Sequence, residues 1–221
     1  MKDELIVNEI FGSIDGEGLR TGELATFIRL AGCNLRCRYC DTDYALKINQ
    51  GIKMTIEDIL NEIKKIGYKN ITLTGGEPLL QKNSSLLIDE LIKNDYKVNI
   101  ETNGAIDITP YISKNVLLTM DCKTNSSEMM KYMLESNLSK LRANDVLKIV
   151  CNKSDFQDIE KLLKSNDIKS YIYLSPIFNE IEYYELVDFL KDLNKKGFNT
   201  DKIRIQIQLH KIIWEPNKRG V

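Results

Sequence analysis

Three of the five cysteines in this sequence lie within eight residues, in the stretch AGCNLRCRYCDT at positions 31–42. Cys33, Cys37 and Cys40 have the spacing C-x3-C-x2-C. A structural zinc site would need a fourth ligand from a distant part of the chain, and a redox pair needs only two thiols. An iron–sulfur cubane normally takes four thiolates, so three would leave one iron open to an outside ligand. Such an open position indicates catalysis.

Other polar motifs follow apolar runs further along the chain. The segment TLTGGEPLL (72–80) has two glycines, which let the backbone approach a ligand closely, and a carboxylate at Glu77. ETNG (101–104), MDCK (120–123) and QLH (208–210) also come at or just after such runs. If each run is a strand of one parallel sheet, all these motifs face the same edge.

The hydrophobic pattern supports that arrangement, because strand-like runs alternate with amphipathic helical segments. The helix predicted at 55–67 places isoleucines and a leucine on one stripe, with Thr55 as N-cap and Gly67 as the stop. The predicted strands are 24–30, 70–74, 97–101, 116–120, 146–150, 171–175 and 203–210. The predicted helices are 55–67, 84–94, 127–140, 155–164 and 183–195.

This alternation predicts an α/β fold with a mainly parallel sheet and helices outside it. Seven strands are one short of an eightfold barrel, so we expect an incomplete, open TIM-like βα barrel. An open doubly wound sheet is the alternative. We expect residues 1–221 to form a single domain, since the sequence contains no repeat, low-complexity tract or linker.

Composition limits the class of protein. The 221 residues are 43% hydrophobic and 29% charged with net charge −1, which gives no overall attraction to nucleic acid or an anionic membrane. The start of the sequence lacks the pattern of a secretory signal, and no apolar run approaches membrane-spanning length. The odd number of cysteines argues against a disulfide framework. We therefore expect a cytoplasmic protein with no direct nucleic-acid or membrane partner.

The cysteine motif, with an aromatic residue before its third cysteine, resembles that of the radical S-adenosylmethionine (SAM) enzymes, and the GGE and ETNG segments strengthen the resemblance. It implies that Cys33, Cys37 and Cys40 hold a [4Fe–4S] cluster and that SAM binds its open iron. Many relatives have Ser-Pro-Lys where this chain has Asp-Cys-Lys at 121–123. The SAM contacts that the resemblance implies are Tyr39, Cys40, Asp41, Gly75, Gly76, Glu77, Glu101, Asn103, Asp121, Cys122, Lys123 and Ser175.

Three segments, 9–18, 27–42 and 209–221, further resemble the 7-carboxy-7-deazaguanine synthase family, in order along the chain. This resemblance implies a lyase that converts 6-carboxy-5,6,7,8-tetrahydropterin to 7-carboxy-7-deazaguanine, with release of ammonia, in the synthesis of 7-deazapurines such as queuosine. It also implies Mg²⁺ at Thr42, a homodimer and an electron donor such as flavodoxin or ferredoxin. A hydroxyl is a chemically suitable ligand for Mg²⁺.

The substrate contacts carried over from this family come from both ends of the sequence. Arg29 is suited to a bidentate pair with the pterin carboxylate, and Glu17 to the guanidine-like edge of the pterin. Segment 209–221 is expected to cover the substrate. The residues carried over are Ile14, Asp15, Gly16, Glu17, Arg29, Thr74, His210 and Val221. The family commonly has Gln where this chain has Asp15, and an ionised carboxylate only accepts hydrogen bonds.

Two alternative functions share some of these features. A glycyl-radical-enzyme activase has the same cysteine spacing and acts on a protein. A non-catalytic zinc-binding or RNA-interaction module would use the cysteines only as structural ligands. The thiols of Cys122 and Cys151 are expected to be ordinary small side chains, not cluster ligands.

Overall fold

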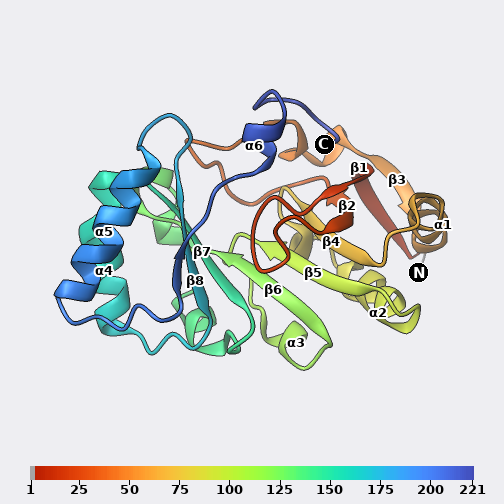
Figure 1. Ribbon diagram of the computed structural model, residues 1–221. Coiled ribbons are helices and arrows are strands. Elements are labelled where there is room, and N and C mark those ends of the chain that lie inside the picture. Colours follow the sequence, from red (N-terminus) through yellow and green to blue (C-terminus); the bar gives the residue numbers. More distant parts are fainter. Residues whose placement is uncertain (1–2) are drawn as a thin grey trace.

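One nine-stranded sheet runs through the computed structural model, which describes residues 3–221 (Figure 1). The strand order is β3-β1-β2-β4-β5-β6-β7-β8-β9. β1 is antiparallel to β2 and β3, whereas all neighbours from β2 to β9 are parallel. The strands are β1 (Glu4–Ile14), β2 (Leu24–Leu30), β3 (Ile52–Thr55), β4 (Asn70–Gly75), β5 (Lys97–Thr102), β6 (Val116–Asp121), β7 (Val146–Cys151), β8 (Tyr171–Pro176) and β9 (Ile203–Ile205). The prediction of a mainly parallel, incomplete barrel is confirmed.

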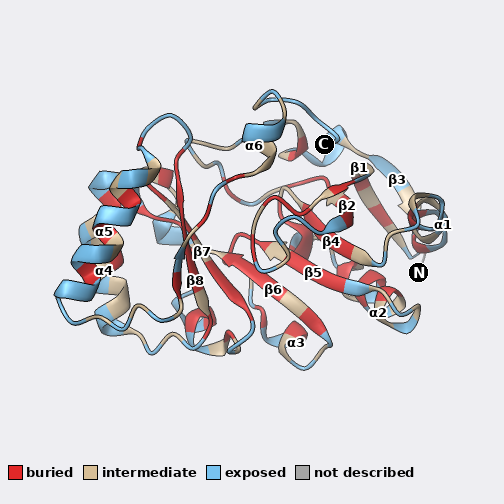
Figure 2. Cartoon of the chain, viewed as in Figure 1, coloured by how far each residue is buried: buried red, intermediate tan, exposed pale blue. Residues whose placement is uncertain are grey.

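The helices are α1 (Ile56–Ile66), α2 (Ser84–Lys93), α3 (Thr109–Ile112), α4 (Phe156–Ser165), α5 (Tyr183–Lys195) and α6 (His210–Ile213). The four longer helices, α1, α2, α4 and α5, lie outside the sheet and turn buried side chains toward it, whereas α6 has no buried residue (Figure 2). Figure 1 shows α4 and α5 beside β7 and β8, and α1 and α2 at the other end of the molecule. Within residues 3–221, no helix combines the length and apolar character needed to cross a bilayer.

Helix α1 illustrates how local sequence sets the elements. Thr55 accepts a hydrogen bond from the Asp58 backbone N–H, and the Asp58 carboxylate accepts one from the Thr55 N–H, which closes a capping box. Ile59 and Ile63 are fully buried on the predicted stripe. Gly67 ends the helix with φ of 86°, a conformation that favours glycine. The predicted start, stripe and stop are all confirmed.

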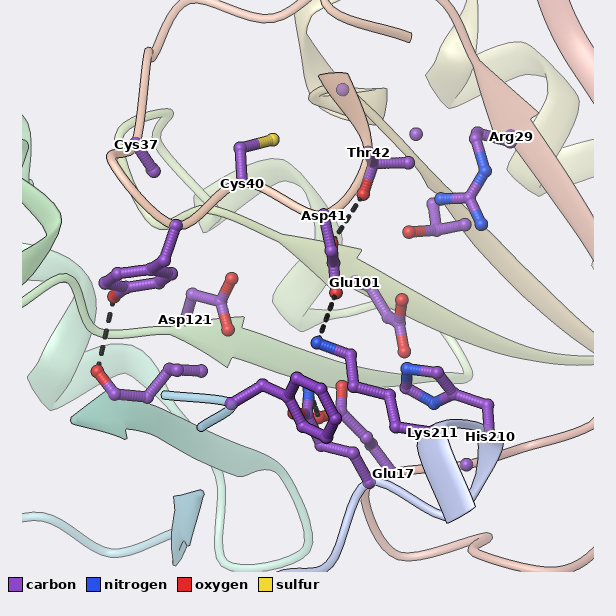
Figure 3. Close-up of a pocket in the computed structure, with 18 of the residues that line it drawn as sticks. Glu17, Arg29, Cys37, Cys40, Asp41, Thr42, Glu101, Asp121, His210 and Lys211 are labelled. Carbon is purple, nitrogen blue, oxygen red and sulfur yellow. Dashed lines mark hydrogen bonds and ion pairs between the residues drawn. The ribbon is translucent and has the colours of Figure 1, made fainter. Parts of the chain in front are cut away.

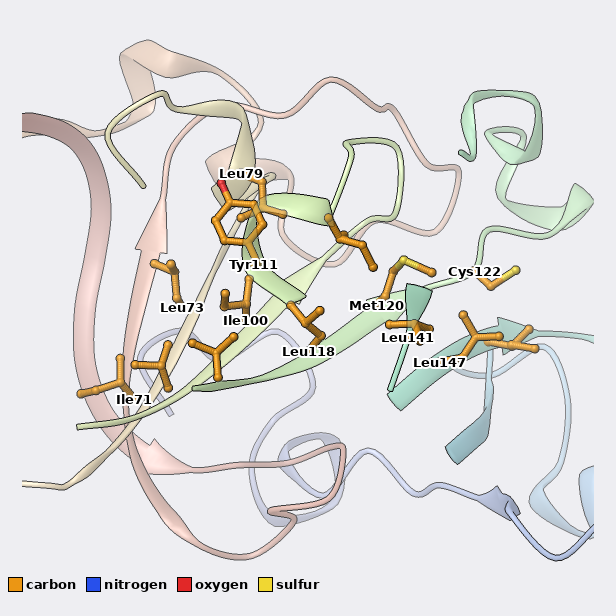
Figure 4. Close-up of a cluster of buried hydrophobic side chains, with 14 of the residues drawn as sticks. Ile71, Leu73, Leu79, Ile100, Tyr111, Leu118, Met120, Cys122, Leu141 and Leu147 are labelled. Carbon is orange, nitrogen blue, oxygen red and sulfur yellow. The ribbon is translucent and has the colours of Figure 1, made fainter. Parts of the chain in front are cut away.

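The sheet has an apolar face and a polar face, because side chains alternate along each strand. The apolar face packs under the helices and includes Ile71, Leu73, Ile100 and Leu118, all fully buried (Figure 4). The opposite positions of the same strands are polar. These are Arg29 on β2, Thr74 on β4, Glu101 on β5, Asp121 on β6 and Lys148 on β7. The pattern of period two therefore places the core and the polar side chains on opposite sides of one layer.

Three expectations about individual elements are corrected. Segment 9–18 carries a predicted motif, but its first part belongs to β1, which no prediction identified, and β3 was also missed. The last strand ends at Ile205 instead of continuing to His210, which is the first residue of α6. His210 is thus held by a helical turn and not by a strand end.

The helix predicted at 127–140 is wrong. The structure has three short 3₁₀ helices there, Asn125–Ser127, Met130–Tyr132 and Glu135–Lys140. Glu128 adopts a left-handed conformation with φ of 62°, which interrupts a helix. The Asn137 side chain donates to the carbonyls of Gly104 and Ile106, so the segment is held by tertiary contacts. Helical propensity is a weak prior that such contacts override.

Candidate active site

The polar face of the sheet lines a cavity of about 490 Å³ at the carboxyl ends of the parallel strands (Figure 3). The loop after β2, the ends of β4 to β7 and the C-terminal segment all contribute to its wall. Of the predicted site residues, those that line it are Ile14, Gly16, Glu17, Arg29, Cys33, Cys37, Tyr39, Cys40, Asp41, Thr42, Thr74, Gly75, Gly76, Glu101, Asn103, Asp121, Lys123, His210 and Val221. The expectation that sequence-distant motifs share one cavity is therefore confirmed.

The cysteine loop, residues 31–42, is held by contacts with distant segments. The Tyr39 hydroxyl donates to the carbonyl of Val150 on β7 over 3.2 Å. The Arg38 backbone N–H donates to the Ser127 carbonyl, and its guanidinium makes two bonds of 2.6 and 2.8 Å to Glu180. The Asn103 amide donates to Asn34 and lies 3.7 Å from the Cys33 sulfur. These bonds position the loop over the ends of β5 and β7.

The three thiols fit the donor set that a cluster requires. All three line the same cavity and none is in a disulfide. Burial raises the pKa of each thiol of Cys33, Cys37 and Cys40. Within residues 3–221, no three side chains of His, Cys, Asp or Glu lie close enough together to hold a metal ion in their present conformations.

A glycine edge joins the end of β4 to the start of the cysteine loop. The Gly76 N–H donates to the Leu30 carbonyl over 3.0 Å. A Cβ atom at Gly76 would lie 2.5 Å from the Gly32 carbonyl oxygen, which cannot move independently of the loop. At Gly75, φ is 154° and a Cβ atom would meet Leu30 backbone. The two glycines are thus required for close packing between the strand and the loop.

Glu77, predicted to contact SAM, does not line the cavity. Its side chain is fully buried, and its carboxylate accepts hydrogen bonds from the N–H groups of Leu79 and Asn103 and from the Thr102 hydroxyl. Burial raises the pKa of Glu77 to about 7, although these donors lower it. Glu77 therefore ties the end of β4 to the turn after β5, and it shapes the cavity wall from behind.

The edge of the cavity opposite the glycine edge carries paired charges. They come from the β1–β2 connection, from the end of β6 and the residues after it, and from β7. The Lys148 ammonium lies 2.8 Å from a Glu17 oxygen and 3.2 Å from an Asp121 oxygen, and Lys123 lies 2.6 Å from the other Asp121 oxygen. Burial opposes ionisation of Asp121, but the two lysines lower its pKa. Burial raises the pKa of Glu101 to about 7, against the effect of Lys148.

A third set of residues surrounds Arg29, elsewhere in the cavity wall. Its Nε donates to Glu9 over 2.7 Å, and the Tyr44 hydroxyl donates to the same Glu9 oxygen over 3.1 Å. This leaves the two terminal nitrogens of the guanidinium without a hydrogen-bond partner in residues 3–221. They form the fork that suits a carboxylate. Arg219 stacks on the Tyr44 ring at 3.6 Å, which brings the C-terminal segment beside Arg29.

The C-terminal segment docks on the β1–β2 connection through His210. A Cβ atom at Gly16 would lie 2.7 Å from His210 Nδ1, so the absence of a side chain there permits the approach. Burial lowers the pKa of His210, which favours the neutral imidazole at pH 7. Lys211 lies 3.4 Å from Asp41 and, against the burial of that carboxylate, lowers the pKa of Asp41 to about 2. The Thr42 hydroxyl donates to Asp41.

Three other predicted contacts do not line the cavity. Asp15 is buried and accepts a hydrogen bond from Thr72 while pairing with Arg20 at 3.2 Å, so it secures the β1–β2 connection to β4. The Cys122 side chain packs in the apolar core, as does that of Cys151. Ser175 is fully buried on β8. All three side chains are buried, whereas their neighbours in the same motifs line the cavity.

Several lining residues were not identified from the sequence. Lys148 occupies the polar position of the apolar strand VLKIV, a signal that alternation could have revealed. Gln208 donates to Glu17 over 3.0 Å from a segment with alternating glutamines. Tyr44, Lys211 and Arg219 lie in irregular or short helical segments. No periodic signal marks residues of that kind.

Comparison with known proteins gives a consistent result. The family model described as the radical SAM superfamily matches residues 27–190. The chain is 44% identical to the 7-carboxy-7-deazaguanine synthase of Clostridium acetobutylicum over 97% of this chain and 98% of that protein. It is 36% identical to the synthase of Methanospirillum hungatei over 95% and 86%. A crystal structure of QueE from Escherichia coli shares the fold, with a TM-score of 0.70 and 24% identity over 92% and 94% of the two chains.

Proposed function

The chain belongs to the radical SAM superfamily and, within it, to the 7-carboxy-7-deazaguanine synthase family, and we propose on this basis how its residues serve that reaction. The enzyme is a carbon–nitrogen lyase that uses a [4Fe–4S] cluster and SAM in 7-deazapurine and queuosine biosynthesis. The substrate is 6-carboxy-5,6,7,8-tetrahydropterin, which undergoes ring contraction and releases ammonia. The relatives, which match nearly the whole chain, do not support the activase or zinc-module alternatives.

Cys33, Cys37 and Cys40 would hold the cluster, and SAM would lie between the cysteine loop and the glycine edge. When bound, the cluster and SAM supply the radical that removes the hydrogen from C6 of the pterin. The protein binds and orients the two molecules. Gly76 permits close approach of the strand to the loop. Asn103 and Lys123 offer polar atoms that line the same cavity.

At the other end, Arg29 would bind the pterin carboxylate. Its Nε is already engaged by Glu9, so the guanidinium plane is fixed before substrate arrives. Glu17 would accept hydrogen bonds from the guanidine-like edge of the pterin, and neutral His210 would contact the ring. Val221 lines the same cavity, and we propose that the C-terminal segment covers the substrate.

Mg²⁺ would bind at Thr42, where the hydroxyl and the adjacent Asp41 carboxylate provide oxygen ligands. Mg²⁺ keeps several waters and takes few protein oxygens, so this sparse set is suitable. We also propose a homodimer, a cytoplasmic location and a flavodoxin or ferredoxin as the source of the electron. Sedimentation of the anaerobically purified protein tests the dimer.

One observation carries the proposal: the three thiols and the free fork of Arg29 line one cavity. The experiment is anaerobic incubation of the reconstituted enzyme with reductant, SAM, Mg²⁺ and 6-carboxy-5,6,7,8-tetrahydropterin. We expect 7-carboxy-7-deazaguanine and ammonia in equal amounts. If the enzyme cleaves SAM yet yields no deazaguanine from this pterin, the substrate assignment is wrong.

A further inference from the structure

Lys148 is a cation that lies between two carboxylates of the cavity wall, those of Glu17 and Asp121. It projects from β7, and its side chain is 13% exposed. Its ammonium lies 2.8 Å from Glu17 Oε2, on the substrate side, and 3.2 Å from Asp121 Oδ1, on the cofactor side. Asp121 is also its register partner on β6. No motif identified in the sequence includes this residue.

We propose that Lys148 is a positioning residue for the lyase reaction, which orients Glu17 toward the pterin while it holds Asp121 on the cofactor side. This inference rests on the proposed function, because it takes Glu17 as the group that binds the pterin edge. It assigns to Lys148 an effect on substrate binding that is exerted through Glu17 and without contact between Lys148 and the reacting atoms.

The contacts of Glu17 explain why a second residue is needed to orient it. Lys148 donates to one carboxylate oxygen and Gln208 donates to the other over 3.0 Å. Two donors, one on β7 and one in the connection between β9 and α6, therefore fix the plane of the carboxylate. Each oxygen keeps a further acceptor position, and Glu17 lines the cavity. The Lys148 bond joins two charged groups and the Gln208 bond only one, so Lys148 contributes more to the orientation than Gln208 does.

The local charges argue against Lys148 as a proton donor or acceptor. Burial opposes its charge, but Asp121, Glu17 and Glu101 together raise the pKa of Lys148 well above its usual range. An ammonium held in that way stays charged across the physiological pH range. Without it, Glu17, Glu101 and Asp121 would line one cavity, and of the three only Asp121 would keep an ion pair among residues 3–221, the one with Lys123. Lys148 therefore also balances charge between the substrate and cofactor sides.

The experiment compares kinetics of the reconstituted holoenzyme and its Lys148→Met and Lys148→Arg variants. Lys148→Met should raise the KM for 6-carboxy-5,6,7,8-tetrahydropterin by about tenfold or more, as expected when a hydrogen bond to a charged group is lost. The kcat and the cluster absorption should change less. Lys148→Arg should restore KM to within about threefold of wild type, since a guanidinium can pair with both carboxylates.

A matched control is Lys196→Met. Lys196 also bridges two carboxylates, lying 2.7 Å from both Glu160 and Asp192, but on the exposed surface. It should leave pterin KM unchanged, because exposed ion pairs contribute little and these are far from the cavity wall. An equal rise in KM in this variant would show a nonspecific effect of lost charge and would overturn the proposal.

A double variant tests whether Lys148 acts through Glu17. When Glu17 is already replaced in Glu17→Gln, adding Lys148→Met should change pterin KM by less than about threefold. Additive effects, or a wild-type KM in Lys148→Met, would overturn the inference. If Lys148→Met does not fold, Lys148→Gln decides: the same loss supports the inference and a wild-type KM contradicts it. Failure of the wild-type enzyme to convert the pterin would instead reject the proposed function itself.

Discussion

Two carboxylates on opposite edges of the cavity are stabilised in different ways. Glu77, at the end of β4, has no cation partner among residues 3–221 and accepts three hydrogen bonds, two of them from backbone N–H groups. Asp121, at the end of β6, is paired with Lys123 and Lys148. The pKa of Glu77 is raised to about 7, whereas that of Asp121 is lowered. Burial acts on both residues, so neighbouring charges decide the direction.

The two edges of the cavity therefore depend on different interactions. The glycine edge near Glu77 depends on backbone geometry, and side chains there can vary only where the main chain permits it. The charged edge near Asp121 depends on side-chain pairs, which a substitution can change without moving the strands. We expect changes at the first edge to affect folding and the cofactor, and changes at the second edge to affect mainly ligand binding.

We expect the largest effect from a substitution in the cysteine loop, residues 31–42. Cys37→Ala should abolish cluster binding and all SAM cleavage, because it removes one of three thiolates. Absorption near ~400 nm, the usual region for such clusters, and 5′-deoxyadenosine formation measure this. Cys151→Ala is the control, since that thiol lies in the apolar core. Continued formation of 5′-deoxyadenosine by Cys37→Ala would contradict the cluster assignment.

Gly76→Ala should disrupt the close packing at the glycine edge. Its Cβ would lie 2.5 Å from the Gly32 carbonyl oxygen, so the loop must shift. We expect a loss of about 2–4 kcal/mol in unfolding free energy, as for other overpacked sites, and much weaker SAM binding. Urea unfolding and SAM titration measure these.

A matched control for this substitution is Gly22→Ala. Unlike Gly76, Gly22 has a positive φ, of 89°, and no atom lies within 4 Å of the added Cβ. It should cost about 1–2 kcal/mol from backbone strain and leave SAM binding unchanged. Equal effects of the two variants on SAM binding would refute the role of close packing at Gly76.

A ligand-directed change is Arg29→Ala. It should raise the dissociation constant for the pterin by about 10- to 100-fold, since a charge-assisted contact contributes on the order of 1.5–3 kcal/mol. SAM cleavage uncoupled from product should persist. Arg29→Lys tests the fork: it keeps the charge but loses bidentate geometry, so it should be only partly active. Wild-type affinity in Arg29→Ala would remove the residue from the site.

The smallest expected effect is on the pH dependence of the free energy of unfolding, through the buried Glu77. Burial raises the pKa of Glu77 in the folded protein to about 7, above its ordinary value of 4.5, so the folded state keeps a proton that the unfolded state loses. Stability from this group is complete below pH ~4.5 and falls as pH rises to ~7, by at most about 1.4 kcal/mol per pH unit. Glu101, also near 7, adds a slope of the same sign.

Glu77→Gln should therefore reduce, but not remove, the loss of stability between pH 5.5 and 7.5. The comparison is the urea midpoint of each anaerobically purified protein at the two pH values. The variant should be less stable at pH 5.5, because its amide places an N–H beside a backbone donor. An unchanged slope would show that Glu77 is ionised in the folded protein throughout this range.

Much of the fold could be predicted because it depends on local periodicity. The stripe of α1 and its capping box follow from the sequence of residues 55–67 alone. The strands that carry Thr74, Glu101 and Asp121 were predicted to within a residue or two, since apolar runs mark buried parallel strands. The helix predicted at 127–140 failed where Glu128 interrupts it and contacts from Asn137 hold the segment.

The sequence by itself determined that three thiols, a glycine turn and polar strand ends would share one cavity, because cysteine spacing and the rule for parallel sheets need no coordinates. Only the tertiary structure decided the direction of each side chain. It turned Asp15 and Glu77 into buried supports and brought Lys148 between Glu17 and Asp121. The physical reason is that spacing along the chain fixes which edge a residue reaches, whereas its partners there come from strands far away in sequence, and the pairing of those partners depends on packing of the whole sheet.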